Sequence, residues 1–189
     1  FNDYGNLVGT CTASTGGNCT IGDQFDGGEV EVKGIELLAG TTWGDRAGGG
    51  FSFPVSLVYT YTDARFRTDF VSGYEPWGTV SAGDQLPYQP EHQFTVNAGV
   101  ETARARLNAT LNWVSETRAT AGQGAIAPGD RIDGRTVVDL SAEIDLVPGI
   151  SAFGTVQNVF DVVYNAGFSP SGARPGAPRL WLAGLRARL

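Results

Sequence analysis

Every second residue is apolar in seven separate segments of this chain, and this alternation constrains the fold more than any other feature of the sequence. Residues two apart lie on the same face of a β-strand, and their neighbours lie on the opposite face. In the last segment Trp181, Ala183 and Leu185 share one face, while Arg186 and Arg188 lie on the other. The sequence therefore predicts an all-β fold with a sheet whose two faces meet different surroundings.

Seven antiparallel strands are predicted, over residues 29–43, 51–66, 86–101, 103–117, 136–146, 150–161 and 179–189. In the first of them the alternation slips by one residue near Gly34. Val30 and Val32 share a face, but Ile35 and Leu37 continue out of step with them. Because glycine suits a bulge, a β-bulge at 33–34 is predicted to restore the phase.

The connections between these segments alternate strictly between short and long. The short ones fall within 41–50, 100–106 and 145–151, and the long polar ones within 5–28, 65–91, 115–135 and 162–179. In an up-and-down meander this places all long loops at one end of the sheet. Such sorting is typical of outer-membrane barrels, whereas structureless loops near 20 residues are uncommon in compact domains.

Charge follows the same division between the two faces. Apart from that of the weaker segment 150–161, where Phe153 is out of phase, the apolar faces carry no charged residue. The opposite faces hold Arg104, Arg106, Asp139, Glu143, Asp145, Arg186 and Arg188. An arginine facing lipid near the midplane costs about 2–4 kcal/mol, but a wet lumen tolerates it. Aromatic residues near the strand ends suit the two interfaces of a bilayer. The pattern predicts a transmembrane antiparallel up-and-down β-barrel.

Other classes of protein find little support in the composition. The net charge of −7 argues against nucleic-acid binding. The one histidine, His92, follows Glu91 directly, so on a strand the two side chains point to opposite faces and make a poor catalytic pair. Residues 128–139 lack the dense oxygen spacing of a calcium loop. No catalytic residue, metal site or cofactor is predicted, and the chain is not expected to be an enzyme.

The two cysteines, Cys11 and Cys19, lie in one long polar loop with no histidine or third cysteine nearby. A zinc site would need four ligands. A disulfide between Cys11 and Cys19, formed in an oxidising compartment, is the favoured interpretation, and two unpaired thiols are the alternative.

Four segments resemble TonB-dependent outer-membrane receptors: "VEVKGIEL", "LPYQPEHQFTVNAG", "VVDLSAEIDLVPGISAFGTVQNVFDVVYNA" and "GARPGAPRLWLAGLRARL". The third contains the run "NVFDVVY" at Asn158–Tyr164, which is similar to the family's Asn-Leu-Phe-Asp-x-x-Tyr. Residues Gly172–Arg179 resemble the branch of ferric dicitrate and related siderophore receptors. The resemblance extends over essentially the whole chain and is strongest from Leu86 onward.

The resemblance implies a barrel of 22 strands in the outer membrane of a Gram-negative bacterium, with the long loops extracellular. It also implies an N-terminal plug domain and active import of a ferric chelate, an iron–siderophore or ferric citrate, driven by the TonB–ExbB–ExbD complex. Since about seven strands cannot close a barrel alone, residues 1–189 are expected to be its C-terminal part, with the plug and the first strands preceding them. A passive porin-type channel and a soluble all-β binding domain are the alternatives.

Arginine is the expected ligand-binding residue, because many ferric chelates are anionic and a guanidinium binds carboxylates through two hydrogen bonds. The substrate-binding candidates are Arg67, Arg118, Arg131, Arg135 and Arg174, all near the long loops, with Arg65 and Arg179 in the same region. The alternative is that these arginines pair with nearby carboxylates, namely Asp63, Asp69, Glu116, Asp130 or Asp133, or bind phosphates of lipopolysaccharide. Outer-membrane lipid and lipopolysaccharide are expected partners, and nucleic acid is not.

Overall fold

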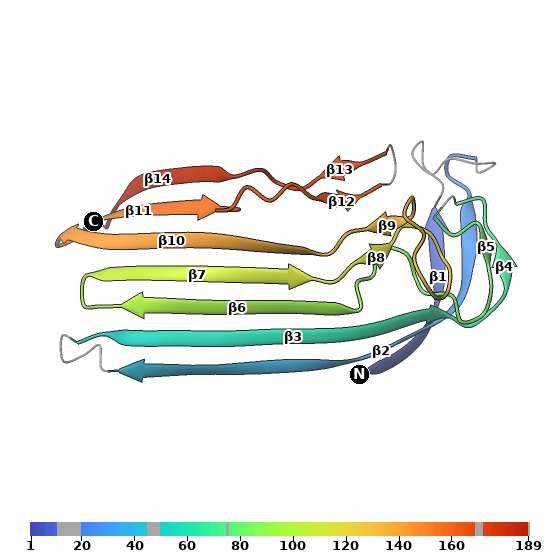
Figure 1. The fold of residues 1–189 in the computed structure, drawn as a ribbon, viewed down its shortest axis with the longest axis horizontal. Helices are drawn as coiled ribbons and strands as arrows, with labels where there is room; N and C mark the ends of the chain where they lie inside the picture. Colours follow the sequence, from blue (N-terminus) through green and yellow to red (C-terminus); the bar gives the residue numbers. More distant parts are fainter. Residues whose placement is uncertain (11–19, 45–49, 75, 169–171, 189) are drawn as a thin grey trace.

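A computed structural model describes residues 1–10, 20–44, 50–74, 76–168 and 172–188 of the chain. One antiparallel sheet of eight strands dominates it, in the order β1-β2-β3-β6-β7-β10-β11-β14 (Figure 1). The strands are β1 (Asn2–Thr10), β2 (Gln24–Gly44), β3 (Ser52–Phe66), β6 (His92–Glu101), β7 (Ala105–Val114), β10 (Arg135–Val147), β11 (Ile150–Gln157) and β14 (Leu180–Ala187). Each strand pairs with the next one in the meander, and the sheet is open.

Three two-stranded hairpins decorate the long connections. They are β4 (Phe70–Val71) with β5 (Thr79–Val80), β8 (Thr117–Arg118) with β9 (Arg131–Ile132), and β12 (Asn165–Gly167) with β13 (Arg174–Pro175). All three lie at the same end of the sheet, opposite the short turns (Figure 1). The predicted sorting of long and short connections is confirmed. No helix in the described ranges is long and apolar enough to cross a membrane.

The all-β fold and the seven predicted strands are confirmed, but an eighth strand is present and several bounds differ, since β2 already begins at Gln24 rather than at residue 29. β1 is an eighth strand, which the alternation did not reveal because its residues are mostly polar or glycine. β6 begins at His92 rather than at residue 86, because the segment before it bonds to the end of β3: the Leu86 N–H donates to the Ala64 carbonyl at 3.0 Å. β11 ends at Gln157, since Asn158 and Asp161 adopt positive φ angles of 49° and 54°.

Between the short turns and the level of Tyr61, the register of the ladder places the alternating apolar residues on one face of the sheet. Leu111 lies opposite Val96 on one side and Val138 on the other. Ala152 lies opposite Leu185 in the last pair of strands. We call this surface the apolar face. In the described residues of these strands, from the short turns as far as the pair of Tyr61 and His92, it carries no aspartate, glutamate, lysine or arginine.

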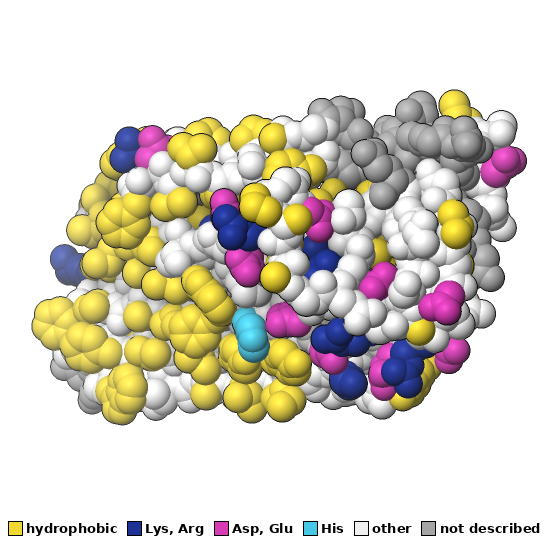
Figure 2. All heavy atoms as spheres, turned by 45° about the vertical axis from the view of Figure 1, so that its right-hand side comes forward, with side chains coloured by type: hydrophobic (Ala, Val, Ile, Leu, Met, Phe, Trp, Pro, Cys, Tyr) yellow, Lys and Arg dark blue, Asp and Glu magenta, His cyan; other side chains and the backbone are white. Residues whose placement is uncertain are grey.

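The predicted separation of Leu107, Leu111, Leu140, Ile144 and Leu185 from Arg106, Asp139, Glu143 and Arg186 onto opposite faces is confirmed by this register. Leu107, Ile144 and Leu185 are 51%, 49% and 72% exposed. Figure 2 shows hydrophobic side chains over a broad part of the surface, with the histidine at their border and charged side chains beyond it. A sheet in water would need a second layer over such a surface.

The opposite surface, which we call the polar face, is held by hydrogen bonds between strands. Thr110 donates to Asn97 at 2.7 Å, and the Asn97 amide donates to Ser56 at 3.2 Å. Phe153 also lies on this face, which explains why it was out of phase. Its ring occupies the space left by Gly184 on the neighbouring strand, and a Cβ there would come within 2.7 Å of it.

The predicted bulge at Lys33–Gly34 is wrong. The β2–β3 register runs without a shift from Val30, opposite Phe66, to Gly44. Val30 and Phe66 instead lie on the polar face, where they form a small core with Val80. The apolar residues change face because the surroundings of the sheet change at this level. Toward the long loops, apolar loop residues cover the polar face, and the residues that continue the apolar face are charged.

Gly34 is nevertheless required at this point of β2. A Cβ on it would overlap the backbone carbonyl oxygen of Tyr61. Gly34 also exchanges two backbone hydrogen bonds with Phe1, at 2.9 and 3.0 Å. The glycine therefore allows a close approach of the chain, in an otherwise regular strand.

We expect Gly34→Ala to lower the free energy of unfolding by about 1–3 kcal/mol, the usual range for overpacking. The measurement is urea unfolding of the full-length protein in lipid vesicles. Gly40→Ala, in the same strand, is the control, since its Cβ would lie 3.5 Å from the nearest atom, the Val55 carbonyl oxygen. Equal losses in the two variants would contradict this account of Gly34.

Candidate functional site

Arg118 ties two of the long connections together. Its Nε donates to Gln85 Oε1 at 3.0 Å, and its Nη2 donates to the Gly124 carbonyl at 3.0 Å. The Gln85 N–H donates to the Gly122 carbonyl at 2.9 Å, beside the same contact. Arg118 is only 4% exposed. Its guanidinium therefore stabilises the loops and has little surface to offer a ligand.

A cavity of about 350 Å³ lies beside Arg118. Its lining includes two arginines and two glutamates, Arg65, Arg118, Glu91 and Glu116. Arg65 is held by two contacts within the protein: its Nε lies 2.6 Å from Asp63 Oδ1, and its Nη1 donates to the Gly83 carbonyl at 3.0 Å. The charges of this cavity are balanced by one another, which does not favour an anionic ligand.

A second group of side chains lies around hairpin β12–β13 and the start of β10. Arg135 begins β10 on the polar face, and its guanidinium carbon lies 4.8 Å from the centroid of the Tyr164 ring. This distance suits a cation–π contact. Gly176 leaves room for the same ring, because a Cβ on it would overlap the ring atoms. Arg135 is thus held by an aromatic face and not by a carboxylate contact that the structure records.

The same hairpin brings a second arginine and a second tyrosine to this region. Arg174 is paired with Gly167 across the hairpin and is exposed. Gly167 in turn lies against Tyr88, since a Cβ on it would be 3.4 Å from the ring carbon Cε1. We call the group Tyr88, Arg135, Tyr164 and Arg174 the hairpin site.

Sequence reasoning selected the two arginines of this site but missed both tyrosines. The signal was present, since Tyr88 belongs to "LPYQPE" and Tyr164 ends "NVFDVVY", two of the segments singled out for their resemblance. Guanidinium groups can bind the anionic oxygens of a ligand, and tyrosine rings add contact area and a hydroxyl. The site could therefore hold an anionic ligand of moderate size.

The remaining candidate arginines are paired with carboxylates. Arg131 Nε lies 2.9 Å from Asp133 and 4.0 Å from Glu116. Arg67 Nη1 lies 3.5 Å from Glu31 Oε2. For Arg131, as for Arg65, the partners are among those that the alternative interpretation named.

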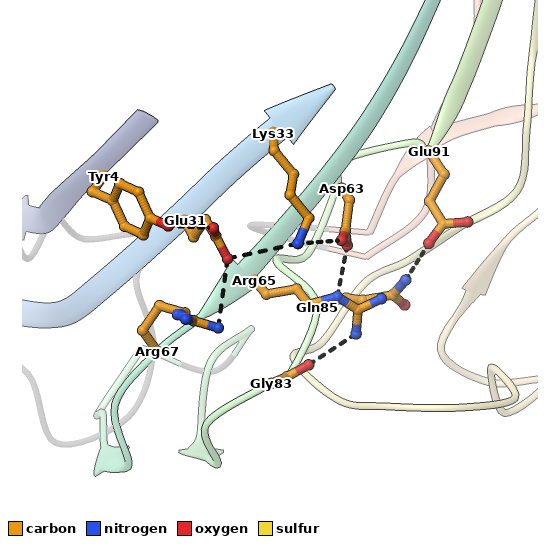
Figure 3. A network of polar contacts seen from close by, with 9 residues as sticks. All are labelled: Tyr4, Glu31, Lys33, Asp63, Arg65, Arg67, Gly83, Gln85 and Glu91. Carbon is orange, nitrogen blue, oxygen red and sulfur yellow. Dashed lines mark hydrogen bonds and ion pairs between the residues drawn. The ribbon is translucent and has the colours of Figure 1, made fainter. Parts of the chain in front are cut away.

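Glu31 and Arg67 belong to the network of charges drawn in Figure 3. By the strand register this network lies beyond Tyr61, on the side toward the long loops. The members, which we call the rim cluster, are Glu31, Lys33, Asp63, Arg65 and Arg67. Lys33 Nζ lies 3.7 Å from Glu31 and 3.5 Å from Asp63.

Tyr4 completes this network from β1. Its hydroxyl donates to Glu31 Oε1 at 2.6 Å. This hydrogen bond, helped by the positive charges of Lys33 and Arg67, holds the pKa of the Glu31 carboxyl below its ordinary value. Glu31 is therefore a carboxylate at neutral pH, and its charge is already neutralised from within the protein.

Charges also gather on the polar face near the short turns. Glu143 lies between Arg106, at 3.6 Å, and Arg186, at 3.2 Å, and it accepts a hydrogen bond from Ser151 at 3.2 Å. Arg186 also lies over the Phe153 ring, 5.6 Å from its centroid. These arginines lie far from the long loops, on the face where the sequence placed them.

Cys11 and Cys19 lie outside the described residues, so their disulfide stays a prediction. Among the described residues, no three histidine, cysteine, aspartate or glutamate side chains come together as a metal site would require.

Arg118 is buried among the loops and Arg174 is exposed, and this difference can be tested. We expect Arg118→Gln to loosen the loops, because it removes two charged hydrogen bonds worth about 1.5–3 kcal/mol each. Limited proteolysis of the full-length protein should then cleave within residues 116–135 several times faster. Arg174→Gln, at an exposed position, should leave the cleavage rate unchanged. Unchanged cleavage in both variants would mean that Arg118 does not hold the loops.

Comparison with known proteins agrees with this architecture. Residues 1–159 match the family described as TonB dependent receptor-like, beta-barrel. No curated protein matches the chain. Among solved structures, the chain resembles the siderophore receptor PiuA from Acinetobacter baumannii, with a TM-score of 0.66 and 15% identity over 92% of this chain and 23% of that one.

Two further structures are similar to the same extent. The closed form of the ferric-catecholate import receptor Fiu from E. coli K12 has a TM-score of 0.63 and 23% identity, over 88% of this chain and 22% of that one. FpvA of P. aeruginosa, bound to a heterologous pyoverdine and iron, has a TM-score of 0.60 and 18% identity, over 88% and 20%. The chain thus spans between a fifth and a quarter of these receptors, and at such identities the likeness shows the fold. By its family match over residues 1–159, the chain belongs to the TonB-dependent receptor β-barrel family.

Proposed function

We propose that the chain is the C-terminal part of an outer-membrane receptor that imports a ferric chelate, an iron–siderophore or ferric citrate. The observation that carries the proposal is the hairpin site at the long-loop end of the sheet, where Arg135 lies over the Tyr164 ring and Arg174 pairs with Gly167, the residue that lies against Tyr88. Family membership and the siderophore receptors among the similar structures support it.

The two faces of the sheet support the membrane part of the proposal. Along β3 the apolar face runs from Phe53 to Tyr61, about 26 Å at roughly 3.3 Å per residue. At the usual strand tilt of about 35–45° this stretch covers about 18–22 Å of the membrane normal, which is most of the apolar band of about 25 Å that an outer-membrane barrel presents between its two aromatic girdles. Trp43 lies near the short turns, and Trp113 near the long loops. In this arrangement lipid covers the apolar face and water fills the lumen beside the polar face.

Ligand capture is assigned to the arginines of the hairpin site. Arg135 has its cation–π contact with Tyr164, and Arg174 is exposed, so both can turn guanidinium N–H groups toward carboxylate or hydroxamate oxygens. Arg67, Arg118 and Arg131, the other predicted contacts, are held by Glu31, Gln85 and Asp133. They take a secondary part, by keeping the loops in place around the ligand.

The rest of the transport cycle belongs to parts of the receptor that precede this chain. A plug domain would close the lumen, and the TonB–ExbB–ExbD complex would supply the energy for its movement. The long loops would be extracellular, where they meet the chelate first. Iron is the cargo of this reaction, and no resident cofactor is required.

Binding of ferric dicitrate and of a ferric catecholate to the full-length protein tests the ligand assignment. We expect Arg135→Gln to weaken binding of the anionic chelate about 10-fold or more, since a charged hydrogen bond is worth roughly 1.5–3 kcal/mol. Quenching of tryptophan fluorescence gives the affinity, and uptake of radioactive iron gives the transport rate. Arg188→Gln, near the short turns, is the control and should bind normally. If both variants bind as the unchanged protein does, the hairpin site is not the ligand site.

The membrane assignment has its own test in two adjacent residues of β10. Leu140 lies on the apolar face and Ser141 on the polar face. Leu140→Arg should cost about 2–4 kcal/mol and reduce the amount of assembled barrel, while Ser141→Arg meets water and should be milder. Heat-modifiable mobility in isolated outer membranes measures the folded fraction. Equal damage from the two changes would argue against lipid on the apolar face.

A further inference from the structure

We propose that Lys33 and Arg67 of the rim cluster bind a phosphate of an outer-leaflet lipid, which in an outer membrane is lipopolysaccharide. The inference rests on the membrane placement proposed above, and it adds a defined headgroup site to it. Neither cation is in the hairpin site, so lipid binding and chelate capture would use different faces of the sheet.

The position of the rim cluster is set by the strand register. Lys33 lies opposite Asp63, and the next pair on the same face toward the short turns is Ile35 with Tyr61. The cluster therefore begins two residues, or about 7 Å, beyond the last aromatic level of the apolar face. His92 lies at that level too, opposite Tyr61. Figure 2 shows hydrophobic side chains, then the histidine, then charged side chains following one another along this surface. A lipid whose chains cover the apolar face would therefore carry its headgroup at the height of the cluster.

The different burial of its acidic and basic side chains gives the exposed surface of the rim cluster a positive charge. The carboxylates of Glu31 and Asp63 are only 10% and 12% exposed. The side chains of Lys33 and Arg67, in contrast, are 49% and 50% exposed. The negative charges thus lie beneath and the positive charges above them. A lipid approaching the barrel from outside meets N–H donors first, and these complement a phosphate.

The hydrogen bonding of the cluster leaves these two cations available. Lys33 contacts its carboxylates at 3.5 and 3.7 Å, and Arg67 contacts Glu31 at 3.5 Å, which are loose ion pairs. Arg65 is held more firmly, at 2.6 Å from Asp63, and also donates to Gly83. Lys33 and Arg67 can therefore keep their contact with the protein while they turn their other N–H groups toward a ligand.

The main competing occupant, a divalent cation, fits the same residues less well. It would need open carboxylate oxygens. Glu31 already accepts the hydroxyl hydrogen of Tyr4 at 2.6 Å, and Asp63 accepts Arg65. Glu29 is exposed on the same side, but it lies two residues beyond Glu31 toward the long loops and is not a member of the rim cluster. The geometry thus favours a phosphate bound directly by the two cations.

The test measures binding of diphosphoryl lipid A to the full-length protein in detergent micelles, with monophosphoryl lipid A and phosphatidylethanolamine for comparison. We expect the double change Lys33→Gln and Arg67→Gln to weaken binding of diphosphoryl lipid A about 25-fold, at roughly five-fold for each cation. The affinity of the unchanged protein should fall with added salt. The control is Arg186→Gln, which removes an arginine that is likewise 49% exposed and paired with a covered carboxylate, but on the polar face.

Each outcome bears on the inference. It is overturned if the double variant binds diphosphoryl lipid A as the unchanged protein does, if Arg186→Gln weakens binding equally, or if the unchanged protein does not bind it. It is also overturned if EDTA abolishes binding, because the phosphate would then be held through a divalent cation. Heat-modifiable mobility shows that each variant is folded. Binding of ferric dicitrate and of the ferric catecholate, measured on the same samples, reports separately on the proposed receptor function.

Discussion

The unbroken antiparallel ladder from β1 to β14 is the constraint on which the rest of this structure depends. In a strand, a slip of one residue moves every side chain to the other face. In this sheet such a slip would bring Arg106 and Glu143 to the apolar face, where the neighbouring residues are Leu107 and Ala142. The charge-free apolar face and the hydrogen-bonded polar face therefore specify the same register. A register shifted by one residue would place charged side chains on the apolar face and would also remove the hydrogen-bonding groups from the polar face.

The same ladder explains why the apolar residues of β2 change face near Gly34, although the strand has no bulge there. The β2–β3 register has no shift at Lys33–Gly34, but the surroundings of the two faces of the strand differ on either side of this point. Toward the short turns the apolar residues face outward, as Ile35 does. Toward the long loops they face the loop core, as Val30 does beside Phe66 and Val80. The place where apolar residues change face thus marks the border of the proposed lipid region, and the rim cluster begins at that border.

The sequence was a good guide wherever a regular period met one uniform environment. The strands β3, β7 and β10 were predicted close to their observed bounds because each alternates for ten or more residues. Prediction failed where tertiary contacts replace the period. β1 is mostly polar and pairs with the part of β2 that lies toward the long loops, and residues 84–86 bond to the end of β3. Phe153 fits a space left by Gly184 on the paired strand β14.

The candidate site was predictable in residue type but not in grouping. Charge alone marked seven arginines near the long loops, and nothing in their spacing distinguished those held by carboxylates from Arg135, which lies over a tyrosine ring. That distinction arises from hairpin β12–β13, whose two strands are separated by six residues and whose contacts reach Tyr88 in another loop. Binding sites on loops depend on such distant contacts, because the scaffold fixes only where each loop begins and ends. In this chain the sheet fixes Arg135 at the start of β10, and the folded loop decides that its neighbour is an aromatic ring.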